Sequence, residues 1–103
     1  MQTIQQLMGK HKTILLPSQE RTLQEVGGNI QLARLRRNLS TEQVSERAGI
    51  ARSTLVKVEK GDQGVAIGTY LKVLFVLGLD YQFKQIGAED TLGRKLQDAK
   101  LIK

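Results

Sequence analysis

A short segment in the middle of the chain carries side chains suited to contact with a polyanion. Its basic, hydroxyl and small apolar members are Arg52, Ser53, Thr54, Val56, Lys57 and Lys60. An arginine can donate two parallel hydrogen bonds to O6 and N7 of a guanine, and a valine can touch the methyl group of a thymine. Lysine and hydroxyl groups reach phosphate oxygens. We therefore treat these residues as DNA-binding candidates, with Arg52 as the base reader and Lys57 and Lys60 as phosphate contacts.

The residues before this segment predict a short helix that ends in a tight turn. Ser40 is an N-cap candidate, and Gln43 follows at the capping-box spacing, so the helix opens at Ser40 or Thr41. Gly49 stands where the helix must stop, because glycine tolerates the left-handed conformation common at that position.

A second helix, from about residue 51 to residue 60, would carry the basic segment itself. Leu55 and Val58 form its inward stripe. Two helices crossing over a glycine turn make a helix-turn-helix unit, whose second helix enters the major groove of DNA with its N-terminal end at the bases. Arg37 and Thr41, which precede this helix, are further candidates for phosphate contact.

The composition favours the same partner and disfavours several other functions. The chain has 103 residues, enough for one domain, and its net charge of +6 and pI near 9.9 favour a polyanion. It has no cysteine and a single histidine, His11, so we expect no catalytic residues, no metal site, no cofactor and no enzymatic activity. No signal peptide or membrane-length apolar run is visible, and we expect a cytoplasmic location without membrane contact.

Hydrophobic periodicity divides the chain into regions and predicts a mostly α-helical fold. One long helix is expected from about residue 19 to residue 38, with a possible break at Gly27-Gly28, and another from about 67 to 77. The predicted regions are an N-terminal arm with a possible short strand (1–17), a helix-turn-helix domain (18–78), a dimerisation strand (79–86) and a C-terminal short helix or tail (87–103).

The predicted strand rests on strict alternation of apolar and polar residues. Leu79, Tyr81 and Phe83 alternate with polar neighbours, which is typical of a strand. A single strand cannot satisfy its own backbone groups. We favour pairing with the same strand of a second copy, which makes these three residues a dimer interface, because readers of this type bind two half-sites as dimers. The alternative partner is the segment 12–16 of the same chain.

The helix-turn-helix segment resembles the XRE-type, or lambda-repressor-like, DNA-binding domain. The shared residues are Leu39-Ser40, Val44, Ala48-Gly49-Ile50, Arg52-Ser53-Thr54-Leu55, Glu59 and Gly61. The resemblance implies a bundle of four to five helices, a palindromic operator bound by a homodimer, and a structural ion pair between Arg34 and Glu59. Thr41 and Ala51 depart from the family pattern, in which glutamine and serine are common at these places.

The predicted strand and tail after the helical domain resemble, more narrowly, the HipB-like antitoxins. That resemblance implies a repressor that also binds a HipA-type serine/threonine kinase toxin and represses its own operon. A stand-alone XRE-family transcriptional regulator is the alternative. A protein-bridging module of the same fold is a third possibility, disfavoured because the second helix carries basic and hydroxyl groups.

Overall fold

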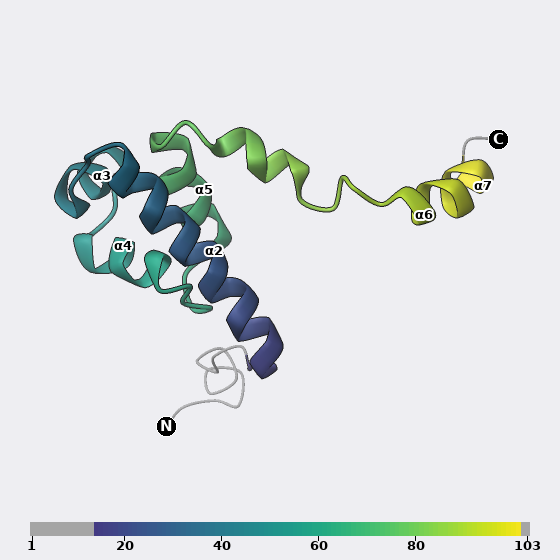
Figure 1. Ribbon diagram of the computed structural model, residues 1–103, viewed down its shortest axis with the longest axis horizontal. Coiled ribbons are helices and arrows are strands. Elements are labelled where there is room, and N and C mark those ends of the chain that lie inside the picture. The colour runs from purple at the N-terminus through teal and green to yellow at the C-terminus, as the bar shows by residue number, and fades with distance from the viewer. Residues whose placement is uncertain (1–13, 102–103) are drawn as a thin grey trace, which may run out of the picture.

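The computed structural model describes residues 14–101, and the ribbon in Figure 1 is helical over most of this range. The elements in chain order are α2 (Pro17–Arg36), α3 (Thr41–Ala48), α4 (Arg52–Glu59), α5 (Ile67–Val76), the 3₁₀ helix η1 (Asp80–Gln85), α6 (Thr91–Gly93), the π-helical turn η2 (Arg94–Asp98) and α7 (Ala99–Leu101). The last three follow one another without a gap and form a single C-terminal helix. The mostly helical fold predicted from the sequence is confirmed.

The first helix is continuous through Gly27-Gly28, so the possible break at these glycines is absent. α2 begins at Pro17, whose missing N–H costs nothing in the first turn of a helix. The amide oxygen of Gln19 accepts a hydrogen bond of 2.9 Å from the backbone N–H of Leu16, which satisfies a donor just outside the helix. Of the predicted segment 12–16, residues 12 and 13 lie outside the described residues, and residues 14–16 form neither helix nor strand.

The turn between the next two helices forms as its residues predict. The Ser40 hydroxyl accepts from the Gln43 backbone N–H at 3.0 Å, and the Gln43 side chain accepts from the Ser40 N–H at 2.9 Å, so the capping box is complete. Gly49 has a φ of 68° and ends α3 in the left-handed conformation. The predicted boundary of α3 is confirmed.

Apolar residues from α2, α3, α4 and α5 meet in one core. The buried members are Ile30, Ala33, Val44, Ala48, Leu55, Val58, Tyr70, Val73 and Leu77. Leu55 and Val58 are both 0% exposed, so the inward face of α4 is completely buried in this core. The core therefore fixes which face of α4 remains outside.

The predicted strand at residues 79–86 is wrong. These residues form the 3₁₀ helix η1, with Leu79 before it and Ile86 after it, and no strand is present between residues 14 and 101. Leu79 and Phe83 both pack against the core, whereas Tyr81 is 54% exposed. Residues 79–86 therefore offer no edge for strand pairing across a dimer, and the prediction of a strand-type dimer interface at Leu79, Tyr81 and Phe83 is wrong.

The C-terminal helix projects away from the helical body (Figure 1). The Cα radius of gyration is 17.4 Å, compared with about 13 Å expected for a compact chain of this length. Within residues 14–101, no helix combines the length and the apolar character needed to cross a membrane.

Candidate nucleic-acid interface

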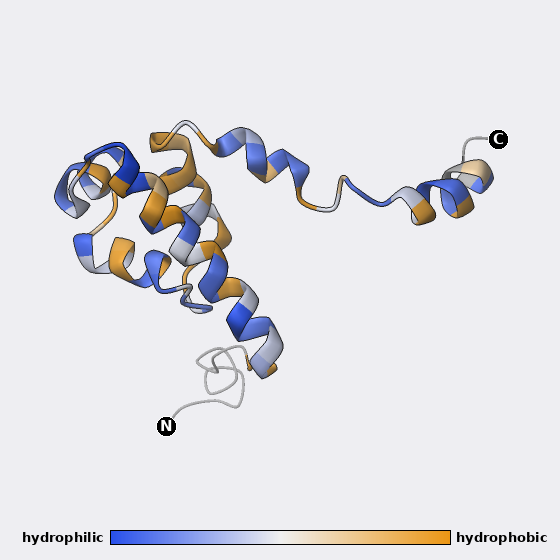
Figure 2. Ribbon diagram, in the orientation of Figure 1, coloured by the Kyte–Doolittle hydropathy of each residue, from blue (hydrophilic) through white to orange (hydrophobic). Residues whose placement is uncertain are grey.

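The outward face of α4 carries the candidate DNA-binding residues. Arg52, Ser53 and Lys57 are exposed, Val56 is 37% exposed, and Thr54 is half-buried. The exposed members lie away from the buried Leu55 and Val58, whereas Thr54 lies four residues before Val58 at the edge of the exposed face (Figure 2 shows the mixed hydropathy of α4). We call this surface the α4 ridge. An α-helix with its side chains is about 10–12 Å in diameter, so α4 fits the major groove, which is about 12 Å wide.

The N-terminal end of α4 lacks a side-chain cap. Ala51 occupies the N-cap position and offers no oxygen, although its carbonyl accepts from Thr54 N at 3.0 Å and Leu55 N at 3.2 Å. The first N–H groups of the helix therefore have no intrahelical acceptor. Free N–H groups at a helix N-terminus favour an anion such as a phosphate.

A buried ion pair ties the far end of α4 to α2. Arg34 Nε donates to Glu59 Oε2 at 2.7 Å and Nη2 donates to Oε1 at 3.0 Å, while Nη1 donates to the Leu39 carbonyl at 2.9 Å. The two side chains are 8% and 6% exposed. The hydrogen bond with Glu59 raises the pKa of Arg34, against the opposing effect of burial. The pair implied by the resemblance is present, and its location makes it structural.

Two glycines that the sequence analysis did not assign to the site bring α2 and α4 into close contact. A Cβ on Gly27 would lie 2.5 Å from Gly61 N and 2.6 Å from Val58 O, and one on Gly61 would lie 2.6 Å from Gln24 N. Gly61 also has a φ of 71°, which side chains rarely adopt. Glycine at both positions therefore lets the end of α4 pack directly on the α2 backbone. The only sequence signal was the improbable pair Gly27-Gly28 within a helix.

The loop after α4 is held by a tyrosine from α5. The Tyr70 hydroxyl donates to the Asp62 carbonyl at 2.7 Å, and the Asp62 carboxylate accepts from Gly64 N at 2.6 Å. Burial, together with the nearby charge of Asp62, raises the pKa of Tyr70. This loop follows directly on Lys60, which is exposed at the C-cap of α4, so the backbone on both sides of Lys60 is fixed.

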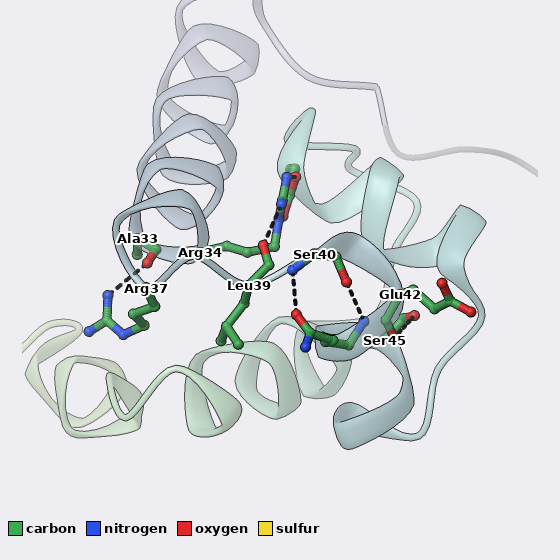
Figure 3. A network of polar contacts seen from close by, with 9 residues as sticks. Ala33, Arg34, Arg37, Leu39, Ser40, Glu42 and Ser45 are labelled. Atoms are coloured by element: carbon green, nitrogen blue, oxygen red, sulfur yellow. Dashed lines mark hydrogen bonds and ion pairs between the residues drawn. The ribbon is translucent and has the colours of Figure 1, made fainter.

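The remaining candidates lie in two different places. Thr41 is half-buried at the first position of α3, where the Ser40 cap and the Ser45-to-Glu42 hydrogen bond of 3.0 Å shape the helix start (Figure 3). Arg37 is exposed, but its Nη1 donates to the Ala33 carbonyl at 2.8 Å on the side of α2 away from Arg34 (Figure 3). Arg37 lines a groove beside η1 and is not brought together with the α4 ridge.

Comparison with known proteins agrees with this geometry. A family model described as helix-turn-helix matches residues 30–83, just over half of the chain. The matched range begins within α2, contains the α4 ridge, and ends in η1. A search among curated proteins found no match to the chain.

Proposed function

The chain belongs to the helix-turn-helix family of XRE type, and from that membership we propose that it is a sequence-specific transcriptional repressor that binds a palindromic operator as a homodimer. DNA-binding regulation is the function of the family. Repression and the two-fold operator are our proposals for this chain, and they are supported by the symmetry with which readers of this kind occupy paired half-sites.

The observation that carries the proposal is the α4 ridge itself. Its members other than Thr54 are exposed, whereas Leu55 and Val58 on the inward side are completely buried, and the Arg34–Glu59 pair holds the helix end. A rigid helix that presents Arg52 at its start and Lys57 one turn later suits base reading followed by phosphate contact. The surrounding net charge of +6 attracts the duplex at long range.

The test is a binding titration with DNA from upstream of the chain's own gene. We expect Arg52→Ala to weaken specific binding by about 1–3 kcal/mol and to relax sequence preference, because a bidentate guanine contact is lost. Lys84→Ala is the matched control, since it removes an exposed positive charge from η1, outside the ridge. Affinity should also fall steeply with salt.

Two outcomes would contradict the proposal. Equal losses for Arg52→Ala and Lys84→Ala would mean that only net charge matters and that the ridge reads no bases. No salt-dependent binding to any duplex would indicate instead a protein-bridging module of the same fold.

A second candidate function is that of an antitoxin for a HipA-type serine/threonine kinase. The strand that favoured this layout is absent from residues 79–86, but an exposed apolar patch on α5 favours a protein partner. Phe75 is 69% exposed and Leu71 is 39% exposed, beside a hollow of about 470 Å³ rimmed by Arg47 and Lys72. This patch lies outside the α4 ridge, so a partner and an operator would not compete for the same side chains.

Affinity capture with the product of a neighbouring kinase gene tests the antitoxin role. We expect the kinase to bind the wild-type chain and to be lost with Phe75→Asp, while DNA binding is retained. Leu32→Asp is the control, because Leu32 is a 51%-exposed apolar residue on α2. Absence of capture, or equal capture by Phe75→Asp, would leave the stand-alone regulator as the function.

A further inference from the structure

An open apolar groove lies beside α2, apart from the α4 ridge. It has a volume of about 760 Å³, and its walls come from α2, α5 and η1. Its apolar lining includes Leu23, Val26, Ile30, Leu74, Phe83 and Ile86. Ile86 is 69% exposed and Val26 is 40% exposed, so part of this lining faces solvent. We call it the α2–η1 groove.

The two ends of the groove carry opposite charge. Arg36 and Arg37 line it at the C-terminal end of α2. Asp62 lines it toward the other end, because the preceding Gly61 packs on the α2 backbone at Gln24. At a rise of about 1.5 Å per residue, the stretch of α2 between Gln24 and Arg36 is about 18 Å long. The groove thus offers an apolar floor between a basic end and an acidic end.

The C-terminal helix has the complementary pattern. Leu92 is 69% exposed and Leu96 is 58% exposed, four residues apart on one side. Acidic residues, Glu89 and Asp90, come before it, and its basic residues, Arg94, Lys95 and Lys100, follow within the helix. Thr91–Leu101 spans about 16 Å as a helix, close to the length of the groove. A helix this short is marginal in water on its own, so it needs a surface to pack against.

We infer that the C-terminal helix of one copy docks in the α2–η1 groove of a second copy, and that the exchange is reciprocal. Leu92 and Leu96 cover the apolar floor, the acidic start of the helix lies at Arg36 and Arg37, and Lys100 lies toward Asp62. We call residues 87–101, which end in the C-terminal helix, the arm. In one chain the arm leaves the groove after Ile86 and runs outward (Figure 1), so the groove is open to the arm of another copy. Figure 2 shows apolar segments on the arm and on α5.

Reciprocal exchange gives the two-fold symmetry that a palindromic operator requires. The inference rests on the proposed function in one respect, the expectation of a dimer with two-fold symmetry. Its residues lie outside the α4 ridge, so a failed dimer interface and a failed DNA surface produce different results in solution. A monomer with an intact ridge would still bind duplex in a salt-dependent manner.

The first test measures the oligomeric state of the full chain by sedimentation equilibrium. We expect a dimer, and we expect Val26→Glu in the groove or Leu96→Glu in the arm to raise its dissociation constant by about tenfold or more. Leu32→Glu, at an exposed α2 position that does not line the groove, should leave the dimer unchanged. A monomeric wild-type chain, or unaltered dimers with both variants, would overturn the inference.

The second test separates exchange between copies from folding back within one copy. The chain has no cysteine, so single cysteines can be introduced without side reactions. When Val26→Cys and Leu96→Cys chains are mixed and oxidised, we expect a disulfide-linked heterodimer joining these two positions. Leu32→Cys mixed with Leu96→Cys should form no such link. Equal cross-linking in both mixtures would show that the arm does not occupy the groove of a second copy.

Discussion

Replacing Gly27 and Gly28 in turn by alanine tests how α4 is positioned. The two glycines are neighbours in the same helix, but their surroundings differ. A Cβ on Gly27 would meet three backbone atoms, Gly61 N, Val58 O and Glu59 O, at 2.5, 2.6 and 2.8 Å. A Cβ on Gly28 would meet nothing within 4 Å. The same chemical change therefore probes the contact between α2 and α4 at one position and open space at the other.

The expected energies have opposite signs. Alanine recovers about 1 kcal/mol of helix propensity at either position. At Gly28 that gain is the whole effect, so we expect stabilisation by up to about 1 kcal/mol. At Gly27 the new methyl group overpacks a backbone contact, which costs about 1–3 kcal/mol and falls at the upper end where no side chain can move aside. The net loss for Gly27→Ala is then about 2 kcal/mol.

Thermal unfolding followed by circular dichroism measures the difference. A loss of about 2 kcal/mol corresponds to a melting temperature about 8–16 °C lower in a domain of this size. Gly27→Ala should also weaken operator binding, since the end of α4 must move, whereas Gly28→Ala should bind as the wild type does. If Gly27→Ala is as stable as Gly28→Ala, the close packing of α4 on α2 is refuted.

Three more substitutions test the groups that surround the ridge. Glu59→Leu leaves the buried guanidinium of Arg34 unpaired and should lower the free energy of unfolding, measured with urea, by about 3–5 kcal/mol. Arg34→Met should restore much of this loss in the double variant, because it removes the unpaired charge. Additive losses for the two substitutions would contradict this coupling. Because burial and the charge of Asp62 raise the pKa of Tyr70, stability present below about pH 10 is lost as the pH rises through that raised pKa. Melting temperatures measured from neutral to alkaline pH should show that Tyr70→Phe removes this alkaline loss of stability. If the pH profile of Tyr70→Phe is the same as that of the wild type, ionisation of Tyr70 is not the cause. Ser40→Ala should lower stability by about 1 kcal/mol in urea unfolding, and no change would mean that the α3 cap contributes nothing.

Features set by neighbouring residues were predictable from the sequence. The capping box of Ser40 and Gln43 and the helix end at Gly49 depend on residues a few positions apart, and both features formed as expected. The inward stripe of α4 followed from the spacing of Leu55 and Val58, which are both fully buried. Because that stripe fixes the rotation of the helix, the exposed positions of the ridge were predictable as well.

Features decided by distant contacts were not. Leu79, Tyr81 and Phe83 satisfy the two-residue period of a strand, but the segment forms a 3₁₀ helix instead. Leu79 and Phe83 pack against the core in this arrangement, and Tyr81 stays outside. In the same way, the need for glycine at residue 27 depends on its close approach to Gly61, 34 positions along the chain. Nothing local distinguishes these cases.

The two faces of α4 are under different structural constraints. Leu55, Val58 and Glu59 face inward, and each is constrained by the core or by Arg34. Arg52 and Val56 face outward, and the fold places no comparable demand on them. Substitutions on the outer face can therefore change the operator without changing the fold, because the contacts that stabilise α4 in the fold are made by its inward face. The fold therefore accepts many different base-reading side chains at these outward positions.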